Sequence, residues 1–209
     1  MSLRREKAAR IKVQVLDQTL RLIGKKSFDD LYIDELCDKV KVSKVTLFKY
    51  FPKKEDILLY YFRVWCLSRS TELLGKPKEG LQGIYFLFDK LSESYENHPG
   101  LLLSLVGYLS DYNRSLKPFP VKSDEKKFLF PNHQGITSIE IHSLEQMLEK
   151  FTLEAIFKKE ITRTSSTRDI TNLFTTVFMG GVVTAHMHQI NPVKLFFRKK
   201  EDMVMKGLG

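Results

Sequence analysis

The chain of 209 residues carries a formal net charge of +9 and is 43% hydrophobic and 28% charged, which supports one or two folded domains and excludes a disordered tail. Its two cysteines, Cys37 and Cys66, are too few for a disulfide-rich secreted scaffold or a multi-cysteine metal site. Residues 1–70 hold 16 Lys and Arg against 9 Asp and Glu, whereas residues 71–209 hold 18 against 16. This local basic excess favours an anionic partner, such as nucleic acid, a membrane surface or an acidic protein.

Two features bear on the compartment of the protein. The N-terminus runs into mixed charge without an apolar stretch, which argues against a signal peptide. Residues 170–193 contain no charged side chain and are long enough to span a bilayer, but their threonines, histidines and amides would need partners in hydrocarbon. We interpret this segment as a buried helix of a cytoplasmic protein, with no membrane as partner.

Apolar residues recur at helical spacing through almost the whole chain. This periodicity predicts helices over 5–24, 32–40, 44–50, 53–74, 81–97, 101–112, 137–162, 167–189 and 192–206. Residues 113–135 contain three prolines and no clean period, and we predict a loop there. No alternating pattern is long enough to indicate a sheet, so the expected fold class is all-α.

Residues 32–54 have the spacing of a helix-turn-helix, with two short helices joined by a tight turn at 40–43. Ser43 is a good N-cap for the second helix, on which Leu47 and Phe51 are predicted to face the core. Threonine can bond a base edge, while lysine and tyrosine bind phosphate oxygens. The helix expected from Lys53 would add a phosphate-binding N-terminus. The predicted DNA contacts are Ser43, Lys44, Val45, Thr46, Phe48, Lys49, Tyr50 and Lys54.

Residues 8–62 resemble the DNA-binding domain of TetR-type transcriptional regulators. The resemblance rests on the pattern Val-Ser-x-x-Thr-Leu-Phe-x-Tyr-Phe-x-x-Lys, which runs from Val42 to Lys54. The chain departs from the family at Lys41 and Val45, where glycine is usual, and at Phe48, where tyrosine is usual. Lys41 would strain the turn if its φ is positive, and Phe48 cannot donate a hydrogen bond to phosphate.

The resemblance implies an N-terminal three-helix helix-turn-helix domain (1–52), a connecting helix (53–74) and a C-terminal helical ligand-binding and dimerisation domain (75–209). It implies a homodimeric repressor on a palindromic operator, with recognition helices about 34–36 Å apart. A small apolar effector would release the DNA. The implied dimer interface includes Phe178, Gly180, Gly181 and Met203, and the implied pocket is lined by Tyr85, Phe88, Tyr108, Tyr112, Phe151 and Phe174.

Two other classes of protein remain open from the residues alone. A helical enzyme or small-molecule carrier is opposed by the lack of a nucleophile–base pair, a glycine-rich phosphate loop and ligand spacing among the histidines. We therefore expect no catalytic residues, no cofactor and no metal. A membrane-surface protein would also use a basic helix, but the first helix lacks a face rich in Trp and Phe. Each pocket aromatic is also compatible with plain core packing.

Overall fold

The computed structural model describes residues 3–114, 117–162 and 165–208. These residues form helices and connecting segments without a strand, which confirms the predicted fold class. The elements are α1 (Leu3–Ile23), η1 (Phe28–Asp30), α2 (Ile33–Val40), α3 (Lys44–Tyr50), α4 (Asp56–Gly75), α5 (Gly80–Asn97), α6 (Pro99–Ser110), α7 (Ser123–Leu129), η2 (Ile136–Ser138), α8 (Leu144–Phe157), α9 (Thr167–Met187) and α10 (Val193–Leu208).

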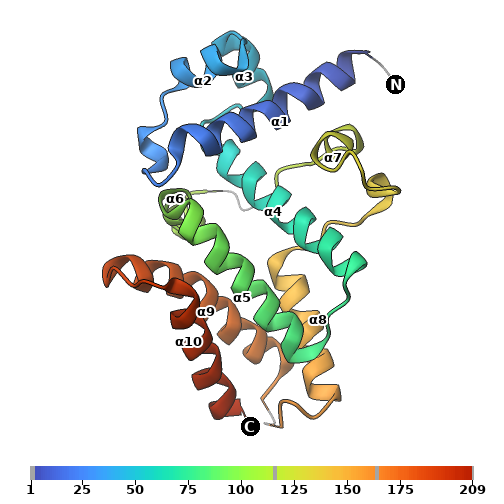
Figure 1. Ribbon diagram of the computed structural model, residues 1–209, viewed down its shortest axis with the longest axis vertical. Helices are drawn as coiled ribbons and strands as arrows, with labels where there is room; N and C mark the ends of the chain where they lie inside the picture. Colours follow the sequence, from blue (N-terminus) through green and yellow to red (C-terminus); the bar gives the residue numbers. More distant parts are fainter. Residues whose placement is uncertain (1–2, 115–116, 163–164, 209) are drawn as a thin grey trace.

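Helices α1, α2 and α3 form a head at one end of the molecule, and α4 runs from it into the larger helical body (Figure 1). Leu16, Leu36 and Leu47 each expose 5% or less of their surface and come from α1, α2 and α3 in turn. Their burial fixes the three helices around one small core, because removing apolar surface from water is the main favourable contribution to packing.

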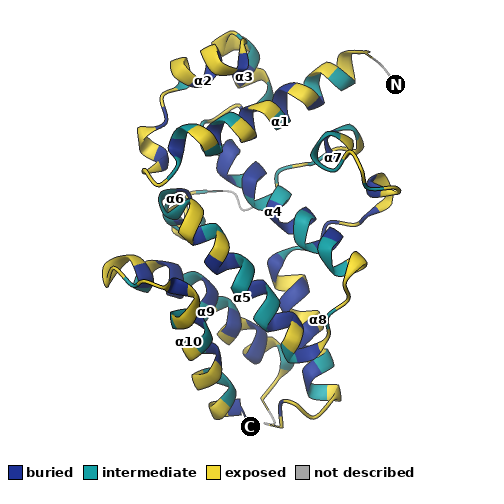
Figure 2. Cartoon of the chain, viewed as in Figure 1, coloured by how far each residue is buried: buried dark blue, intermediate teal, exposed yellow. Residues whose placement is uncertain are grey.

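The body is built around α5, which packs against α8 on one side and α10 on the other (Figure 1). Phe88 of α5 meets three rings, with centroid distances of 6.5 Å to Phe174, 5.3 Å to Phe178 and 5.9 Å to Phe197. Phe178 also lies 6.0 Å from the ring of Trp65 on α4. These aromatic contacts join α4, α5, α9 and α10 in one core, and Figure 2 shows buried residues along the inward faces of these helices.

The uncharged segment forms α9, which is long and apolar enough to cross a membrane by length and composition alone. Of its most apolar window, 39% is buried inside the protein, and a core helix passes the same test. Ile170, Phe174, Phe178 and Val182 are each at most 2% exposed and point into the body. This packing agrees with the interpretation of the segment as a core helix.

The prediction of a loop over 113–135 is wrong for its central part, while residues 115 and 116 lie outside the described residues. Helix α7 occupies Ser123–Leu129 and packs against α1. The helix has only seven residues, and the side chain that it buries most deeply is Glu125, at 2% exposure. A short helix with a charged inward residue leaves no apolar period for sequence analysis to detect.

Two predicted helices begin later than expected. Helix α4 begins at Asp56, whose carboxylate accepts a hydrogen bond of 2.8 Å from the backbone N–H of Lys53. Helix α8 begins at Leu144, after a capping box in which Ser143 and Gln146 bond each other's backbone N–H groups, and it ends at Phe157. At α8 the capping box decides where the helix starts, whereas the N-cap residue of α4, Glu55, makes no side-chain cap hydrogen bond. Apolar periodicity records neither start.

Candidate nucleic-acid interface

The recognition helix expected from the sequence is α3, and its start is fixed by Ser43. The Ser43 hydroxyl accepts a hydrogen bond of 3.2 Å from the backbone N–H of Thr46 and lies 3.0 Å from the Thr46 hydroxyl. Behind the helix, Leu47 is 1% exposed and Phe51 is fully buried. The opposite side of α3 is therefore free to meet a partner.

The turn before α3 contains Lys41 in the left-handed region, at φ 58° and ψ 49°. Its N–H donates to the carbonyl of Asp38 over 3.3 Å, which closes the end of α2. Glycine adopts this conformation freely, whereas a residue with a Cβ loses about 1–2 kcal/mol there. The sequence departure at Lys41 thus places a strained residue beside the recognition helix.

None of the eight predicted DNA contacts is buried. Val45 is 81% exposed and Phe48 39% exposed, and Lys44 and Lys49 are exposed beside them. The pairs Lys44–Phe48, Val45–Phe48 and Val45–Lys49 are three or four residues apart along α3, a spacing that places these side chains on one face. Ser43 is also exposed, and the half-buried members of the set are Thr46, Tyr50 and Lys54. The outer face of α3 therefore presents two ammonium groups beside two apolar side chains.

Lys44 is not a free cation. Its Nζ lies 2.6 Å from Oδ1 of Asp34 on α2. The hydrogen bond to Asp34 and the negative charge of that carboxylate raise the pKa of Lys44 above its ordinary value. Part of the positive charge expected at the interface is thus balanced within the head.

Lys54 lies in a different setting from the predicted one. Residues 52–55 form a bend and a turn before α4, so the expected helix N-terminus at Lys53 is absent and the prediction is corrected. The Lys54 ammonium donates to the carbonyl of Asp29 over 3.1 Å and lies 5.0 Å from the ring centroid of Phe28. These contacts tie the turn before α4 to the short helix η1, and they leave Lys54 half-buried at the side of the head.

A basic cleft of about 600 Å³ lies beside the end of α3, between α1 and residues 119–125. Arg5, Lys49 and Lys122 line it together with Tyr50, and the lining also contains Asp124 and the buried pair of Lys12 and Glu125. Lys122 belongs to the segment predicted as a loop, so only its charge could have indicated it. The cleft extends the positive surface of the head onto a part of the chain far away in sequence.

The six aromatic residues predicted to line one pocket do not all gather at one site, although Phe88 and Phe174 pack against each other. Phe88 and Phe174 are fully buried in the core, Tyr112 is 94% exposed, and Tyr85 lies under the Arg198 guanidinium at 4.6 Å. Tyr108 is half-buried, with the guanidinium of Arg114 5.3 Å from its ring centroid. An aromatic side chain packs equally well in a core, at a surface or in a pocket, so residue type alone did not separate these positions.

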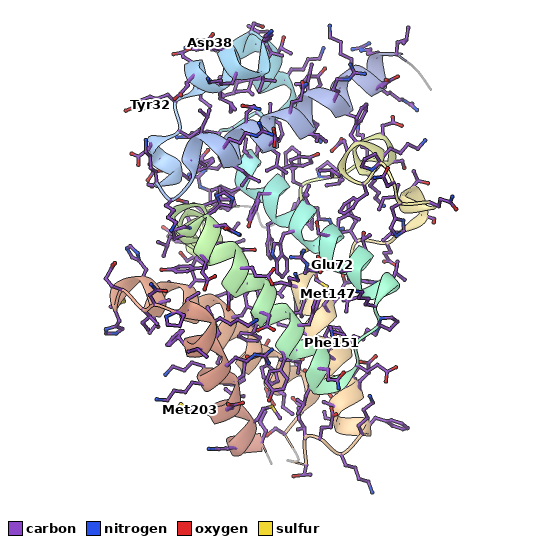
Figure 3. The ribbon with its side chains drawn as sticks, viewed as in Figure 1. Tyr32, Asp38, Glu72, Met147, Phe151 and Met203 are labelled. Atoms are coloured by element: carbon purple, nitrogen blue, oxygen red, sulfur yellow. The ribbon has the colours of Figure 1, made fainter. Side chains whose placement is uncertain are left out.

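Phe151 is the one predicted aromatic that lines a cavity between α4 and α8, of about 420 Å³ (Figure 3). A Cβ at Gly83 of α5 would come within 2.2 Å of the Phe151 ring, so the glycine allows the ring its position. The lining combines apolar and polar side chains, namely Ser70, Leu73, Leu74, Ser138, Ile139, Glu140, His142, Gln146, Met147, Lys150 and Phe151. This composition suits a ligand with an apolar part and a polar end.

The predicted dimer residues divide into two groups. Phe178 is 2% exposed, and Gly181 is buried where a Cβ would lie 2.3 Å from the Phe197 ring. Both therefore pack inside the protomer, and their assignment to a subunit interface stays a prediction. Gly180 is exposed with open space around its Cα, and Met203 is 57% exposed (Figure 3).

Sequence reasoning missed an exposed stripe along α9. Leu173, Thr176, Gly180, Val183 and Met187 follow one another at intervals of three and four residues, and all but Gly180 and Thr176 are apolar. Leu173 is 39%, Val183 37% and Met187 70% exposed. The three-and-four spacing on the outer side of a core helix was the signal that could have indicated this face.

The family model described as bacterial regulatory proteins, tetR family, matches residues 15–61. The matched range runs from α1 into α4 and contains the whole helix-turn-helix. Residues 15–61 of the head therefore match the TetR-type DNA-binding domain by sequence.

Three solved structures share the fold over almost the whole chain. The transcriptional regulator FadR from Bacillus subtilis, in complex with stearoyl-CoA, has a TM-score of 0.64 and 16% identity, over 94% of this chain and 99% of that one. A TetR transcriptional regulator from Rhodococcus sp. RHA1 has a TM-score of 0.58 and 13% identity, over 98% and 100%. A TetR-family regulator from Cytophaga hutchinsonii has a TM-score of 0.54 and 12% identity, over 100% and 97%. A search among curated proteins gives no significant match.

Proposed function

We propose that the protein is a cytoplasmic, homodimeric repressor that binds a palindromic DNA operator through α3 and releases it when an effector binds. The observation that carries this proposal is the exposed face of α3, with Lys44, Val45, Phe48 and Lys49, directly opposite the buried Leu47. A short helix held rigidly from behind and exposed in front fits a major groove.

Each predicted contact has a role that its chemistry supports. Thr46 and Val45 would meet base edges, with the Val45 methyls against a thymine methyl. Lys49 and Tyr50 would bind phosphate oxygens, and Ser43 and Lys44 would do so at the other end of the helix. Phe48 would make apolar contact only. Lys54 would act through the charge that remains exposed beside the Asp29 carbonyl.

The proposed division of the chain follows from these roles: residues 1–52 bind DNA, 53–74 connect, and 75–209 form the regulatory and dimerisation domain. Residues 1, 2, 115, 116, 163, 164 and 209 lie outside the described residues. The α9 stripe, together with Leu195 and Met203 of α10, supports pairing with a second copy, since these apolar side chains lie on the outer side of two adjacent helices. Covering them would bring two heads onto one operator.

The cavity between α4 and α8 is the proposed effector site. Leu73, Ile139, Met147 and Phe151 would hold an apolar chain, and Lys150 at the same cavity suits an anionic end. The structurally similar FadR is described in complex with stearoyl-CoA, which supports an effector with an acyl chain. Because α4 forms one wall and also carries the head, a bound effector would favour a different setting of the two heads.

The DNA-binding proposal is tested by a band-shift assay on a palindrome from the DNA upstream of the protein's own gene. A variant combining Thr46→Ala, Lys49→Ala and Tyr50→Ala should lose the shift, and Lys199→Ala on the distant α10 should keep it. Equal binding by both variants would contradict the proposal. Sedimentation of Val183→Glu, expected as a monomer against a dimeric wild type, tests the subunit contact, and a dimeric variant would count against it.

The effector proposal has a separate test. Palmitate and palmitoyl-CoA are titrated into the protein–operator complex, and release of DNA is measured by fluorescence anisotropy. Met147→Trp should fill the cavity and abolish the response without weakening operator binding, whereas Phe157→Trp, at a site that is 90% exposed, should leave the response unchanged. Release that persists in Met147→Trp would place the effector elsewhere.

A further inference from the structure

Two side chains from outside the helix-turn-helix contact the head, one at Lys12 of α1 and one at Phe51, directly after the recognition helix. They are Phe119 and Glu125, on a segment we call the strap (residues 119–129), which follows the head by more than 60 residues and lies beyond the matched range 15–61. Helix α7 forms most of the strap and lies against α1 (Figure 1).

A buried ion pair fastens the strap to the head. Both carboxylate oxygens of Glu125 lie 2.9 Å from Nζ of Lys12, and the two side chains are 3% and 8% exposed. The same ammonium donates to the carbonyl of Pro120 over 3.3 Å. Burial lowers the pKa of Lys12, and the bonded carboxylate opposes that shift. Lys12 is thus held by two points of the strap.

Several aromatic rings surround this ammonium, and one of them lies at the end of α3. The Lys12 Nζ lies 4.7 Å from the ring centroid of Tyr60 and 4.8 Å from that of Phe119. Phe119 stacks on Phe51 with a centroid distance of 5.4 Å and an interplanar angle of 15°. Phe51 ends the recognition helix, and its N–H donates to the carbonyl of Leu47 over 2.9 Å.

The stacking of Phe119 on Phe51 therefore links the strap directly to the end of α3, and Tyr60 contacts both of these rings. An ion pair buried this deeply loses the hydration of both charges, and apolar residues of similar size often give equal or better stability, so the pair is poorly explained as a stabilising device. It fixes position instead, since a buried carboxylate accepts the ammonium in few geometries. The adjacent basic cleft contains Lys49 and Tyr50, so a shift of Phe51 would move proposed phosphate contacts.

We propose that Phe119 and Glu125 are positioning residues for operator recognition. They keep Phe51, and with it the C-terminal end of α3, at the angle to α1 that lets the helix read its site. The inference rests on the proposed DNA-binding function and adds a determinant of specificity that belongs to the regulatory part of the chain. Neither residue touches DNA in this proposal.

The test compares operator DNA with unrelated DNA of equal length, because loss of positioning lowers specific affinity and leaves backbone affinity unchanged. Phe119→Ala should reduce operator affinity about tenfold, which is about 1.4 kcal/mol, and should leave unrelated DNA within about twofold. Phe86→Ala is the matched control, a half-buried ring of the body on α5. All measurements are made well below the melting temperature of each variant.

A second pair of variants separates loss of positioning from loss of folded protein. Glu125→Gln removes the charge that balances Lys12 and should lower the ratio of operator to unrelated affinity. The combination Lys12→Met with Glu125→Leu replaces the directional pair with packed apolar groups, which should keep the melting temperature while the ratio of operator to unrelated affinity still falls. A wild-type ratio in the combination would overturn the proposal, because apolar packing would then be enough to position the helix.

An unchanged ratio in Phe119→Ala would also overturn it, even if the melting temperature falls, because the ring would then serve stability alone. Failure of the wild type to prefer any operator would instead refute the proposed function. The two failures are therefore distinguishable.

Discussion

The ammonium of Lys44 lies 2.6 Å from the carboxylate of Asp34, so the first residue of the recognition helix pairs with the helix before it. Both side chains are well exposed, at 55% and 74%, and a pair of this kind adds little to stability. Its main effect is on charge: Asp34 places a negative group beside the surface that the proposal assigns to DNA.

We expect Asp34→Asn to strengthen binding to any duplex DNA by a few-fold at low salt and to leave the melting temperature unchanged. The full charge of Lys44 would then face the phosphates, so the slope of log affinity against log salt should steepen by about 0.9. Asp38→Asn makes the same change of charge on α2 without touching Lys44 (Figure 3). Equal effects of the two substitutions would mean that net charge alone matters.

Lys41→Gly should stabilise the head. Lys41 holds φ 58°, which glycine adopts without a steric penalty, so the free energy of unfolding should rise by about 1 kcal/mol. Lys39→Gly, two residues earlier in the last turn of α2, should lower it by about 1 kcal/mol, because glycine is unfavourable inside a helix. Urea unfolding of both variants measures whether the free energy of unfolding changes in opposite directions. A loss of stability in Lys41→Gly would show that Lys41 is not strained.

Neighbouring glycines of α9 should respond to alanine in opposite directions. A Cβ at Gly181 would lie 2.3 Å from the Phe197 ring, whereas nothing lies within 4 Å of one at Gly180. Gly181→Ala should destabilise the body by about 1–3 kcal/mol through overpacking. Gly180→Ala should gain about 0.5–1 kcal/mol from helix propensity, measured on a variant kept monomeric by Val183→Glu so that subunit contacts do not contribute.

Glu201 should make the protein less stable as the pH rises. The side chain is fully buried, and neither carboxylate oxygen has a hydrogen-bond partner in the described part of the chain. Burial raises the pKa from 4.5 to about 9; Asp89 and Asp202 add to the shift, and Arg198 opposes it. The folded state therefore keeps the proton between these values while the unfolded state loses it, so stability falls across that window.

Glu201→Met should remove this dependence. The variant should match the wild type near pH 4 and exceed it by about 1–3 kcal/mol at pH 7, with the difference widening towards pH 9. Denaturant unfolding from pH 4 to pH 9 measures the difference. If the free energy of unfolding of the two proteins changes with pH in parallel, Glu201 is ionised in the folded state.

The head was predictable because its information is local. Ser43 as a cap, Leu47 and Phe51 as inward residues, and the outward lysines all follow from spacing within one short segment. The structure agrees on each of these positions. It differs at Lys54, because the Asp29 carbonyl that binds the ammonium lies 25 residues away in the chain and leaves no local pattern.

The cavity and the strap were not predictable, because they too depend on contacts between residues far apart in the chain. Phe151 lines the cavity and Phe88 does not, although both are aromatic residues on the inward faces of helices. What separates them is the glycine at position 83, opposite one ring, and the three rings packed around the other. The sequence alone predicts a solvated side chain at Glu125. Its burial depends on the ion pair with Lys12, which lies 113 residues away in the chain.

The single tryptophan lies where the connecting helix meets the body. Trp65 is 7% exposed, donates from its indole nitrogen to the Ser94 hydroxyl over 3.0 Å, and meets Phe178 of α9 edge to face. Its fluorescence should therefore peak at short wavelength and respond to changes in the contact of α4 with α5 and α9. The protein thus carries an intrinsic optical probe of the movement that would link effector to DNA, readable in solution without any attached label.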